Sequence, residues 1–231
     1  MVISTFRHLP WCMSAAISPD PSAFQACHAQ ATGASHTLRG RVLGLVGFGN
    51  IGQQIAAKLG HAAFGMRVAY HDVVRRPAAL ETALSASFHS TLASLLAASD
   101  CVVLCTPASP DGRPLITAET LRHVKPGARF VNVARGSLVD EDALADAVEG
   151  GLVSAAALDV HATEPRVHPR LVKLAGLEGE RPGRVMLTCH NAGGTVETHV
   201  GFEELSMRNI MAVLGGGEAL TPVNMEFLRR G

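Results

Sequence analysis

RVLGLVGFGNIGQQIAAKLG, residues 41–60, is the stretch that decides the fold of this chain. Its first part is a continuous apolar run that predicts a strand, and its last part has the period of a helix. Gly47, Gly49 and Gly52 fall at the turn between them, in the spacing GxGxxG. Asp72 ends the next apolar run, 20 residues after Gly52. A strand, a glycine turn, a helix and a downstream acid in this order predict a dinucleotide-binding site.

The three glycines and the start of the helix each have a physical role in such a site. Gly47 permits the tight turn, Gly49 lets the backbone approach a pyrophosphate, and Gly52 lets the helix pack closely on the strand. The helix N-terminus offers backbone N–H groups to the anion. The alternative interpretation is a glycine-rich turn in an α/β domain that binds no ligand, and the downstream acid argues against it.

Short apolar runs alternate with helical stretches from Arg41 onward. The runs are apolar on both faces, as strands covered by helices on both sides require. The predicted fold is therefore α/β, a Rossmann-like doubly wound parallel sheet with helices on both faces. Asp140 and the two acids after it suit a helix N-terminus, so they are interpreted as capping residues. The predicted strands are 41–48, 67–71, 87–90, 101–105, 129–134, 154–160 and 184–190, and the helices between them are 51–60, 91–99, 117–124 and 140–151.

Three parts are expected along the chain. Residues 1–35 form a lead-in segment of short helices around a proline-broken turn. Residues 36–194 form the NAD-binding Rossmann domain, with a polar insertion over 166–184, and residues 195–231 form a closing helix and a tail. The helical pieces expected in the lead-in segment are 2–9 and 22–30, and the closing helix is expected over 195–214.

The composition is that of an ordinary globular chain. Of its 231 residues 47% are hydrophobic, and 20 Lys and Arg balance 20 Asp and Glu, so the formal net charge is zero. A nucleic-acid partner is not expected, because nonspecific affinity for nucleic acids depends on clustered Lys and Arg. A membrane partner is not expected either, because the sequence has neither the pattern of a signal peptide nor a run long enough to span a bilayer.

The cysteines are odd in number, lie far apart and include no CxxC pair. They indicate neither a disulfide framework nor a metal site, so we expect no metal. A reducing compartment fits this usage, and we expect the chain to be cytoplasmic. The five are Cys12, Cys27, Cys101, Cys105 and Cys189.

Asp72 also bears on the choice of dinucleotide. A carboxylate at this position accepts hydrogen bonds from the adenosine ribose and repels a 2′-phosphate, which favours NAD over NADP. Arg75 and Arg76 lie close behind it, and either arginine suits a 2′-phosphate if the loop folds over the ribose. The other interpretation of the two arginines is a charged loop in contact with solvent.

Polar side chains that follow the predicted strands are the candidates for chemistry, because ligands of doubly wound sheets lie beyond the carboxyl ends of the strands. Arg135, Asp159, Glu164 and His190 occupy such positions. An arginine can hold a carboxylate through two parallel hydrogen bonds, a protonated imidazole can donate to a carbonyl oxygen, and a carboxylate can orient that imidazole and raise its pKa. Reduction of a 2-oxo acid needs these groups. Taken singly, Arg135 is also compatible with a surface ion pair, and Glu164 is also compatible with a turn. The spacing alone does not decide whether His161 or His190 is the catalytic histidine.

Three longer motifs resemble those of the D-isomer-specific 2-hydroxyacid dehydrogenases. They are LRGRVLGLVGFGNIGQQIA, VNVARGSLVDEDALADAVEGGLVSAAALDVHATEP and LTCHNAGGT, which lie in this order within residues 36–225. The resemblance implies hydride transfer between NAD(H) and a small 2-hydroxy or 2-oxo acid, of the glyoxylate or hydroxypyruvate reductase kind. Arg135 is then the carboxylate anchor, His190 the acid and base, and Glu164 its support. The implied cofactor contacts are Gly47, Gly49, Asn50, Ile51, Gly52, Asp72, Thr106, Pro107, Asp159, Ala192 and Gly193.

The chain departs from the family pattern mainly at its front. Family members have an N-terminal domain that supplies half of the substrate cleft, and this chain is expected to begin at the helix leading into the cofactor domain. The alternative function is therefore a truncated or noncatalytic NAD-binding protein, such as a redox-sensing interaction protein. A methyltransferase fits less well, because the third glycine and Asp72 suit a dinucleotide. The resemblance also favours a homodimer. Smaller departures are Cys189, Asn191 and His161, at places where the family usually has other residue types.

Overall fold

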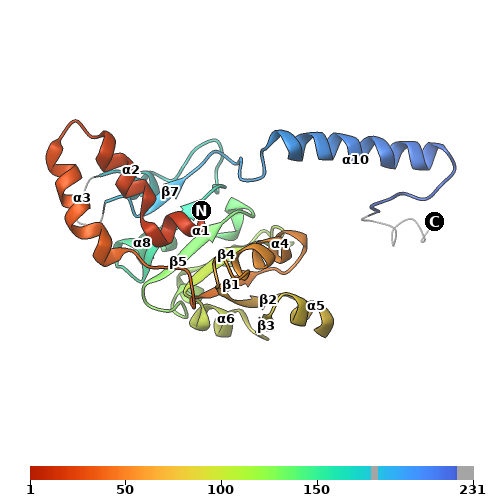
Figure 1. The fold of residues 1–231 in the computed structure, drawn as a ribbon, viewed down its shortest axis with the longest axis horizontal. Helices are drawn as coiled ribbons and strands as arrows, with labels where there is room; N and C mark the ends of the chain where they lie inside the picture. The colour runs from red at the N-terminus through yellow and green to blue at the C-terminus, as the bar shows by residue number, and fades with distance from the viewer. Residues whose placement is uncertain (178–181, 223–231) are drawn as a thin grey trace. The chain divides into compact units, whose positions relative to one another are not determined.

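In the computed structural model, which describes residues 1–177 and 182–222, the strand predicted before the glycine turn is an interior strand of a seven-stranded sheet. The helix predicted after the turn packs on one face of this sheet. The strand order is β3-β2-β1-β4-β5-β6-β7, and every neighbouring pair is parallel. The order reverses at β1, which lies between β2 and β4 (Figure 1). The predicted fold class is confirmed. The strands are β1 (Val42–Val46), β2 (Arg67–His71), β3 (Ala86–Phe88), β4 (Cys101–Leu104), β5 (Ala128–Asn132), β6 (Val153–Leu158) and β7 (Val185–Leu187).

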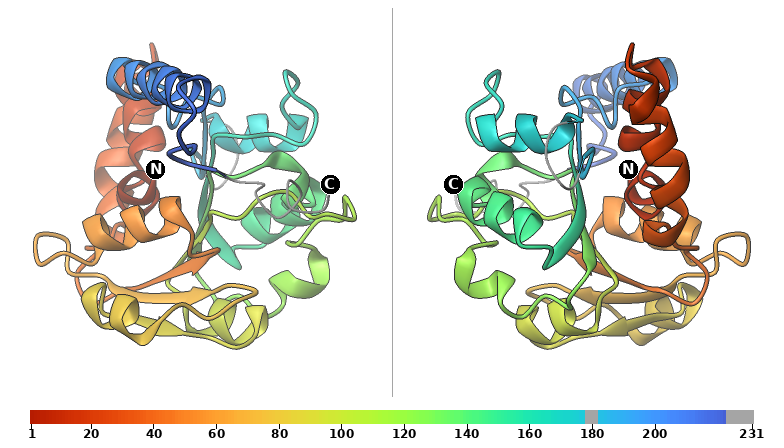
Figure 2. Two further views of the ribbon diagram at one scale, coloured as in Figure 1. Left: turned by 90° about the vertical axis from the view of Figure 1, so that its right-hand side faces the viewer. Right: turned by 90° about the vertical axis from the view of Figure 1, so that its left-hand side faces the viewer.

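Helices cover both faces of this sheet (Figure 2). Alternate strand residues belong to the core on each face. Leu43 and Leu45 of β1 pack with α1 and α4 on one face, whereas Val102 and Leu104 of β4 pack with the helices of the other face. This two-sided burial explains why the strands are apolar without interruption. The first face carries α1 (Val2–Arg7) and α4 (Asn50–Leu59), and the second carries α6 (Leu92–Ala98), α7 (Ala118–Leu121), α8 (Glu141–Glu149) and α9 (Pro169–Ala175).

The N-terminal segment contains more helix than the sequence predicts. The chain turns at His8, whose φ is 48°, and residues Leu9–Ile17 form α2, where a loop was expected. Pro10 lies in the first turn of α2, a place that tolerates proline, so it begins the helix and does not break it. The third helix, α3 (Pro21–Ala34), is capped by Asp20 and runs beyond the predicted 22–30. We define α2 and α3 as the N-terminal hairpin, because the two helices pack on each other.

Two further helices were missed. α5 (Ala78–Ala83) follows Pro77, and α9 lies within the insertion predicted over 166–184. α9 forms because Pro169 suits a first helical turn and Leu171 is fully buried against the sheet. The predicted polar insertion over 166–184 therefore contains a helix that the sequence analysis did not predict, and residues 178–181 lie outside the described part. The strands also end earlier than predicted: β7 stops at Leu187, so His190 follows it by three residues.

The chain divides into two compact units, Met1–His190 and Asn191–Gly231. The lead-in helices belong to the first unit together with the sheet. The second unit holds α10 (Val196–Leu214), close to the predicted 195–214, with the hydroxyl of Thr195 accepting a hydrogen bond from the N–H of Thr198. The predicted tail beyond residue 222 lies outside the described residues. Within residues 1–177 and 182–222, no helix is both long and apolar enough to cross a bilayer.

Candidate active site

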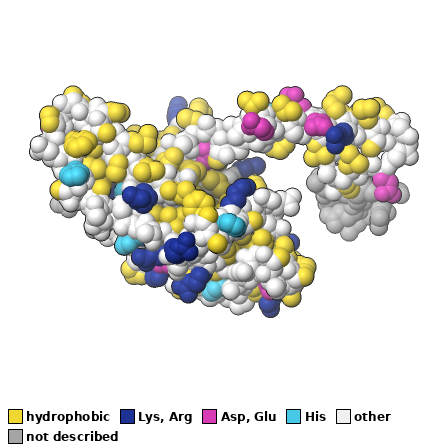
Figure 3. Space-filling view, viewed as in Figure 1, with side chains coloured by type: hydrophobic (Ala, Val, Ile, Leu, Met, Phe, Trp, Pro, Cys, Tyr) yellow, Lys and Arg dark blue, Asp and Glu magenta, His cyan; other side chains and the backbone are white. Residues whose placement is uncertain are grey.

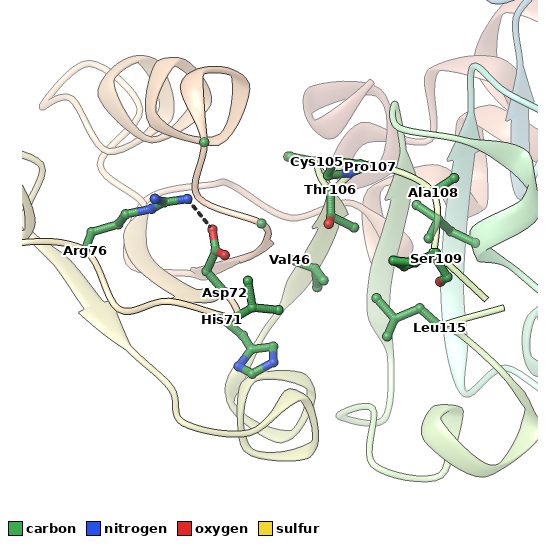
Figure 4. Close-up of a pocket in the computed structure, with 15 residues that line it drawn as sticks. Val46, His71, Asp72, Arg76, Cys105, Thr106, Pro107, Ala108, Ser109 and Leu115 are labelled. Atoms are coloured by element: carbon green, nitrogen blue, oxygen red, sulfur yellow. Dashed lines mark hydrogen bonds and ion pairs between the residues drawn. The ribbon is translucent and has the colours of Figure 1, made fainter. Parts of the chain in front are cut away.

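A pocket of about 520 Å³ opens at the carboxyl ends of β1, β2 and β4, where the strand order reverses. Open α/β sheets bind their ligands at this place. Asp72 and Arg76 lie on one side of the pocket, with Val46 near its floor and Thr106 and Pro107 on the other side (Figure 4). The full lining is Val46, Gly47, Gly49, His71, Asp72, Val73, Arg76, Cys105, Thr106, Pro107, Ala108, Ser109, Pro110, Leu115 and Leu138.

The glycine turn forms one wall of this pocket. Gly47 has a φ of +92°, and a Cβ there would lie 2.8 Å from the carbonyl oxygen of Cys105. A Cβ on Gly52 would lie 2.5 Å from the carbonyl oxygen of Gly47, so helix and strand could not pack as they do. By contrast, a Cβ on Gly49 would meet nothing within 4 Å. The fold therefore needs glycine at 47 and 52, whereas at 49 the missing side chain leaves open space.

The N-terminus of α4 faces the same turn. Gly49 is the N-cap residue and offers no side chain to the first N–H groups of the helix, which begins with Asn50 and Ile51. Helix N-termini of this kind bind phosphate through their backbone N–H groups. The open space at Gly49 and this helix start together fit the pyrophosphate of a dinucleotide.

Asp72 lies at the end of β2 and joins the glycine turn to the following loop. Its Oδ2 accepts hydrogen bonds from the backbone N–H of Phe48 and from Nη2 of Arg76, both at 2.8 Å. Burial alone would raise the pKa of Asp72, but these hydrogen bonds and the charge of Arg76 outweigh burial and lower its pKa. Asp72 is therefore ionised at neutral pH, as an acceptor for ribose hydroxyls must be.

The two arginines behind Asp72 have different partners. Arg76 also donates from Nε to the carbonyl oxygen of Phe48, at 3.1 Å. Arg75 turns to α5, where it makes two hydrogen bonds to Glu81 of 3.0 and 2.9 Å. Arg75 is 63% exposed and does not line the pocket, whereas Arg76 does.

A second group of polar side chains lies where β6 and β7 end. Nδ1 of His190 is 2.9 Å from Oε2 of Glu164, and the other oxygen of Glu164 accepts a hydrogen bond from the backbone N–H of His161. The hydrogen bond from His190 is the main cause that lowers the pKa of Glu164, with the His161 N–H second. The backbone N–H of His190 donates to the carbonyl oxygen of Asp159 at 2.7 Å. His190 has a φ of 55°, and its side chain is half exposed.

His161, the other candidate for the catalytic histidine, has a different environment. His161 is only 7% exposed, and its Nε2 lies 2.9 Å from the carbonyl oxygen of Thr188. This buried ring already uses Nε2 in a hydrogen bond to the backbone that follows β7. His190 instead has Nδ1 held by Glu164 and a side chain that is open to solvent. The two histidines that sequence spacing could not separate therefore differ in access.

Asp159 and Arg135 occupy the neighbouring strand ends. Asp159 is 3% exposed, and its Oδ1 accepts a hydrogen bond of 2.6 Å from the hydroxyl of Thr188. Arg135 follows β5, is exposed, and leads into the short 3₁₀ helix η1 (Gly136–Leu138). The buried Asn132 shapes this turn, donating to the carbonyl oxygen of Arg135 and accepting from the N–H of Ala134.

Close packing brings the Arg135 turn against the loop that carries Glu164. A Cβ on Gly136 would lie 2.0 Å from the carbonyl carbon of His161, so the two backbones touch. The side chain of Glu141 acts at the same place: it is 7% exposed, and its Oε1 accepts a hydrogen bond of 3.0 Å from the backbone N–H of Ala162. Asp140 caps α8 as predicted, but Glu141 is not merely a capping acid.

Glu141 and Asn132 are the contributors to this site that sequence reasoning missed. Glu141 stands in a run of three acids at a helix start, where capping is the ordinary expectation. Ala192 and Gly193, two of the predicted cofactor contacts, belong to the second unit and are therefore described apart from the pocket. Within the described residues, no cluster of three or more His, Cys, Asp or Glu side chains is placed to hold a metal ion.

The sheet, the glycine turn and the acid at its rim define a dinucleotide-binding domain of the Rossmann class. Residues 2–192 match the sequence model described as D-isomer specific 2-hydroxyacid dehydrogenase, NAD binding domain. The chain belongs to this family.

Several known proteins are similar to this chain. A glyoxylate reductase of Thermococcus onnurineus (strain NA1) is 39% identical over 193 residues, which are 84% of this chain and 54% of that protein. The holo D-mandelate dehydrogenase of Rhodotorula graminis has a TM-score of 0.89 at 37% identity, covering 97% of this chain and 63% of that one. An NADPH-dependent glyoxylate/hydroxypyruvate reductase of Sinorhizobium meliloti, solved with NADP and malonate, has a TM-score of 0.73 at 31% identity, covering 96% of this chain and 64% of that one. The chain thus spans about half the length of the curated relative.

Proposed function

We propose that this chain is the cofactor-binding part of an enzyme that transfers a hydride between NAD(H) and a small 2-hydroxy or 2-oxo acid, of the glyoxylate or hydroxypyruvate reductase kind. The observation that carries the proposal is the pair His190 and Glu164, joined at 2.9 Å and located at the carboxyl edge of the sheet that also holds the glycine turn. An imidazole held at Nδ1 by an ionised carboxylate leaves Nε2 for a substrate oxygen.

Each residue has a role in this reaction. Arg135 binds the substrate carboxylate through its two parallel N–H groups. Nε2 of His190 donates a proton to the carbonyl oxygen during reduction and accepts it from the hydroxyl during oxidation. Glu164 orients the imidazole through its hydrogen bond to Nδ1. NADH, when bound, supplies the hydride.

Among the dinucleotides we propose NAD. Asp72 is ionised, lies at the rim of the pocket, and suits the ribose hydroxyls while repelling a 2′-phosphate. Arg76 is already paired with Asp72, so it must leave that carboxylate to meet a phosphate. The Sinorhizobium relative is described as NADPH-dependent, so the fold of the family is compatible with both cofactors. The preference of this chain for NAD or NADP therefore depends on its local charges.

The second candidate function is a protein that binds NAD without useful turnover. The chain matches 54% of the Thermococcus protein and 63% of the Rhodotorula protein, so binding of NADH and turnover are tested separately.

We also propose a cytoplasmic homodimer. The cysteines of the described residues are free thiols, which suits a reducing compartment. The N-terminal hairpin exposes Met13, Ile17 and Phe24, with 68%, 85% and 57% of their surface accessible. Hydrophobic side chains also gather on this part of the first unit in Figure 3. A second copy of the chain is the partner that would cover this surface, because isologous contacts are the commonest in soluble oligomers.

One set of assays tests the proposal. Oxidation of NADH is followed with glyoxylate, hydroxypyruvate, pyruvate and bulkier 2-oxo acids, each repeated with NADPH, and binding of NADH is followed by its fluorescence. We expect NADH binding and turnover with a small 2-oxo acid, lost in His190→Ala and kept in His199→Ala, which changes a histidine of α10. Binding without turnover supports the second candidate, and absence of both contradicts the two together.

A further inference from the structure

Two cysteines meet inside the N-terminal hairpin, away from the dinucleotide pocket. Cys12 lies in α2 and Cys27 in α3, 15 residues apart in the sequence, and their sulfur atoms are 3.7 Å apart. Both belong to the small core of the hairpin, which also contains Trp11 and Ala15. Neither cysteine has a part in the proposed reaction.

The position of the two thiols suits a bond between them. A disulfide has an S–S distance of about 2.05 Å, so the sulfurs need to approach by less than the width of one atom. Helices α2 and α3 already pack on each other, and rotation about the Cα–Cβ bonds moves the sulfurs without moving the helices. The two sulfur atoms are therefore already in contact before a bond forms.

The two thiols differ in access, which gives the reaction an order. Cys12 is partly exposed, whereas Cys27 is only 6% exposed. Burial, together with the neighbouring Cys12, raises the pKa of Cys27 to about 11. A reagent in solution therefore meets Cys12 first, and Cys27 is kept as the second, internal thiol.

The other cysteines lack this arrangement. Burial raises the pKa of Cys101 and of Cys105 to about 12, and both lie in or directly after the central strand β4. Cys189 is exposed and lies beside His190. Modification of Cys189 therefore shows how far an oxidant has reacted with the protein.

We propose that Cys12 and Cys27 are a redox modification site, at which exchange with a small-molecule disulfide such as oxidised glutathione forms a reversible intramolecular disulfide. In the first step the Cys12 thiolate attacks one sulfur of oxidised glutathione, forming a mixed disulfide and releasing one glutathione thiolate, which takes up the proton that Cys12 lost. In the second step the Cys27 thiolate attacks the Cys12 sulfur and releases the second glutathione. Two protein thiols are oxidised, and one glutathione disulfide is reduced to two thiols.

The bond would fasten the hairpin and leave the dinucleotide pocket unchanged. It closes a loop of about 15 residues, which restricts the unfolded hairpin far more than the folded one. Trp11, next to Cys12, packs against the backbone before β7, where a Cβ on Gly183 would lie 2.4 Å from the Cα of Trp11. Oxidation therefore stiffens the hairpin where it rests on the sheet.

The test uses the full chain in glutathione buffers of decreasing reducing power, quenched by alkylation. Arg7 and Arg39 bracket a segment without Lys or Arg, so trypsin leaves both cysteines on one peptide. Cleavage before Asp20 separates them and shows a linked pair directly by mass. Hydrogen exchange of α2 and α3 is compared between the reduced and oxidised forms, with Cys12→Ser and Cys27→Ser as matched variants and Cys189→Ser as control.

We expect two peptides joined through Cys12 and Cys27, two fewer alkylated thiols, and amide exchange in α2 and α3 slowed by roughly tenfold or more. Cys12→Ser and Cys27→Ser should lose this change, whereas Cys189→Ser should keep it. A lasting glutathione adduct on Cys12, or unmodified Cys12 and Cys27 in buffers that modify Cys189, overturns the proposal. Because none of these measurements uses a cofactor or a substrate, their outcome is independent of the proposed activity.

Discussion

Glu164 holds His190 by one carboxylate oxygen, with Oε2 and Nδ1 2.9 Å apart, and uses its other oxygen to hold the chain that leads out of β6. The carboxylate is thus fixed from both sides. Its pKa is lowered first by the hydrogen bond from His190 and next by the backbone N–H of His161. The ionised form of Glu164 therefore persists through the neutral range, where the proposed proton transfer takes place.

Glu164→Gln should slow the reaction. The amide keeps the size of the side chain but removes the charge that pairs with His190. We expect reduction to slow by on the order of a hundredfold at neutral pH. The measurement is the rate of NADH oxidation. Glu149→Gln, which changes an exposed partner of Arg170, is the control, and an unchanged rate in Glu164→Gln would falsify the pairing.

Arg135→Lys should weaken substrate binding. A lysine keeps the charge but loses the planar pair of donors that matches a carboxylate. We expect KM for the 2-oxo acid to rise by roughly tenfold or more, with the affinity for NADH unchanged. Steady-state kinetics and NADH fluorescence separate the two effects. Arg113→Lys, at an arginine 85% exposed, is the matched control, and equal KM values in the two variants would remove Arg135 from the anchor role.

Gly49 and Gly52 should respond differently to alanine. Gly52→Ala places a Cβ 2.5 Å from the carbonyl oxygen of Gly47, so we expect a loss of about 1–3 kcal/mol in unfolding free energy together with weaker NADH binding. Gly49→Ala has open space, so we expect an unchanged Tm and an NADH affinity lower by roughly tenfold or more. Thermal unfolding and fluorescence titration measure both. Normal NADH binding in Gly49→Ala would show that no pyrophosphate approaches this residue.

Asp72→Asn should shift the cofactor preference. It removes the charge that repels a 2′-phosphate and releases Arg76 from its ion pair. We expect the affinity for NADH to fall and that for NADPH to rise, each by about tenfold. Adding Arg76→Ala should abolish the gain for NADPH. A double variant that binds NADPH as well as Asp72→Asn does would show that Arg76 is not the phosphate partner.

Asp100 gives a prediction about stability and pH. It is buried at the start of β4, with Oδ1 2.6 Å from Nζ of Lys125 and Oδ2 2.8 Å from the backbone N of Val42. Burial raises the pKa of Asp100, but the hydrogen bonds from Lys125 and Val42 and the nearby positive charges outweigh it, so the net pKa is lowered. A lowered pKa in the folded state contributes stability above the unfolded value, near 4, that is lost as pH falls through the folded value.

Asp100→Asn should therefore cost about 1–3 kcal/mol of unfolding free energy at pH 7. The difference from the original chain should shrink as the pH falls below about 4. Urea unfolding at several pH values measures this, with the exposed Asp111→Asn as control. A difference that stays constant down to acid pH would mean that the charge of Asp100 does not matter.

The strands could be predicted from sequence because burial on both faces makes each one apolar without a break. Their ends could not, as β7 shows: the strand stops at Leu187, although the backbone N–H groups of Thr188 and His190 still donate to the chain that ends β6. α5 and α9 were missed because helices of six and seven residues span too few turns to show a period. α2 was missed because helix was predicted in this segment only over 2–9 and 22–30, whereas the structure starts a new helix in which Pro10 lies in the first turn.

The candidate site, like the fold, could be predicted only in part from the sequence. Positions after strands pointed to Arg135, Asp159, Glu164 and His190, because the carboxyl ends of parallel strands share one edge. The access that separates His190 from His161 depends on the carbonyl of Thr188, a contact between residues 27 positions apart. The pairing of Arg76 with Asp72 likewise depends on the path of a loop. Such contacts leave no periodic trace in the sequence.

The hydrogen bond between Glu141 and the backbone of Ala162 has a consequence for protein engineering. It joins α8 to the loop after β6, although 20 residues separate the two partners in the sequence. These two segments must therefore be kept together when parts of the chain are exchanged. A chimera that exchanges β6 and its loop with those of a homologue needs the matching α8 as well. Crossovers placed between them would leave a buried carboxylate without its partner in a protein that still shows every familiar motif.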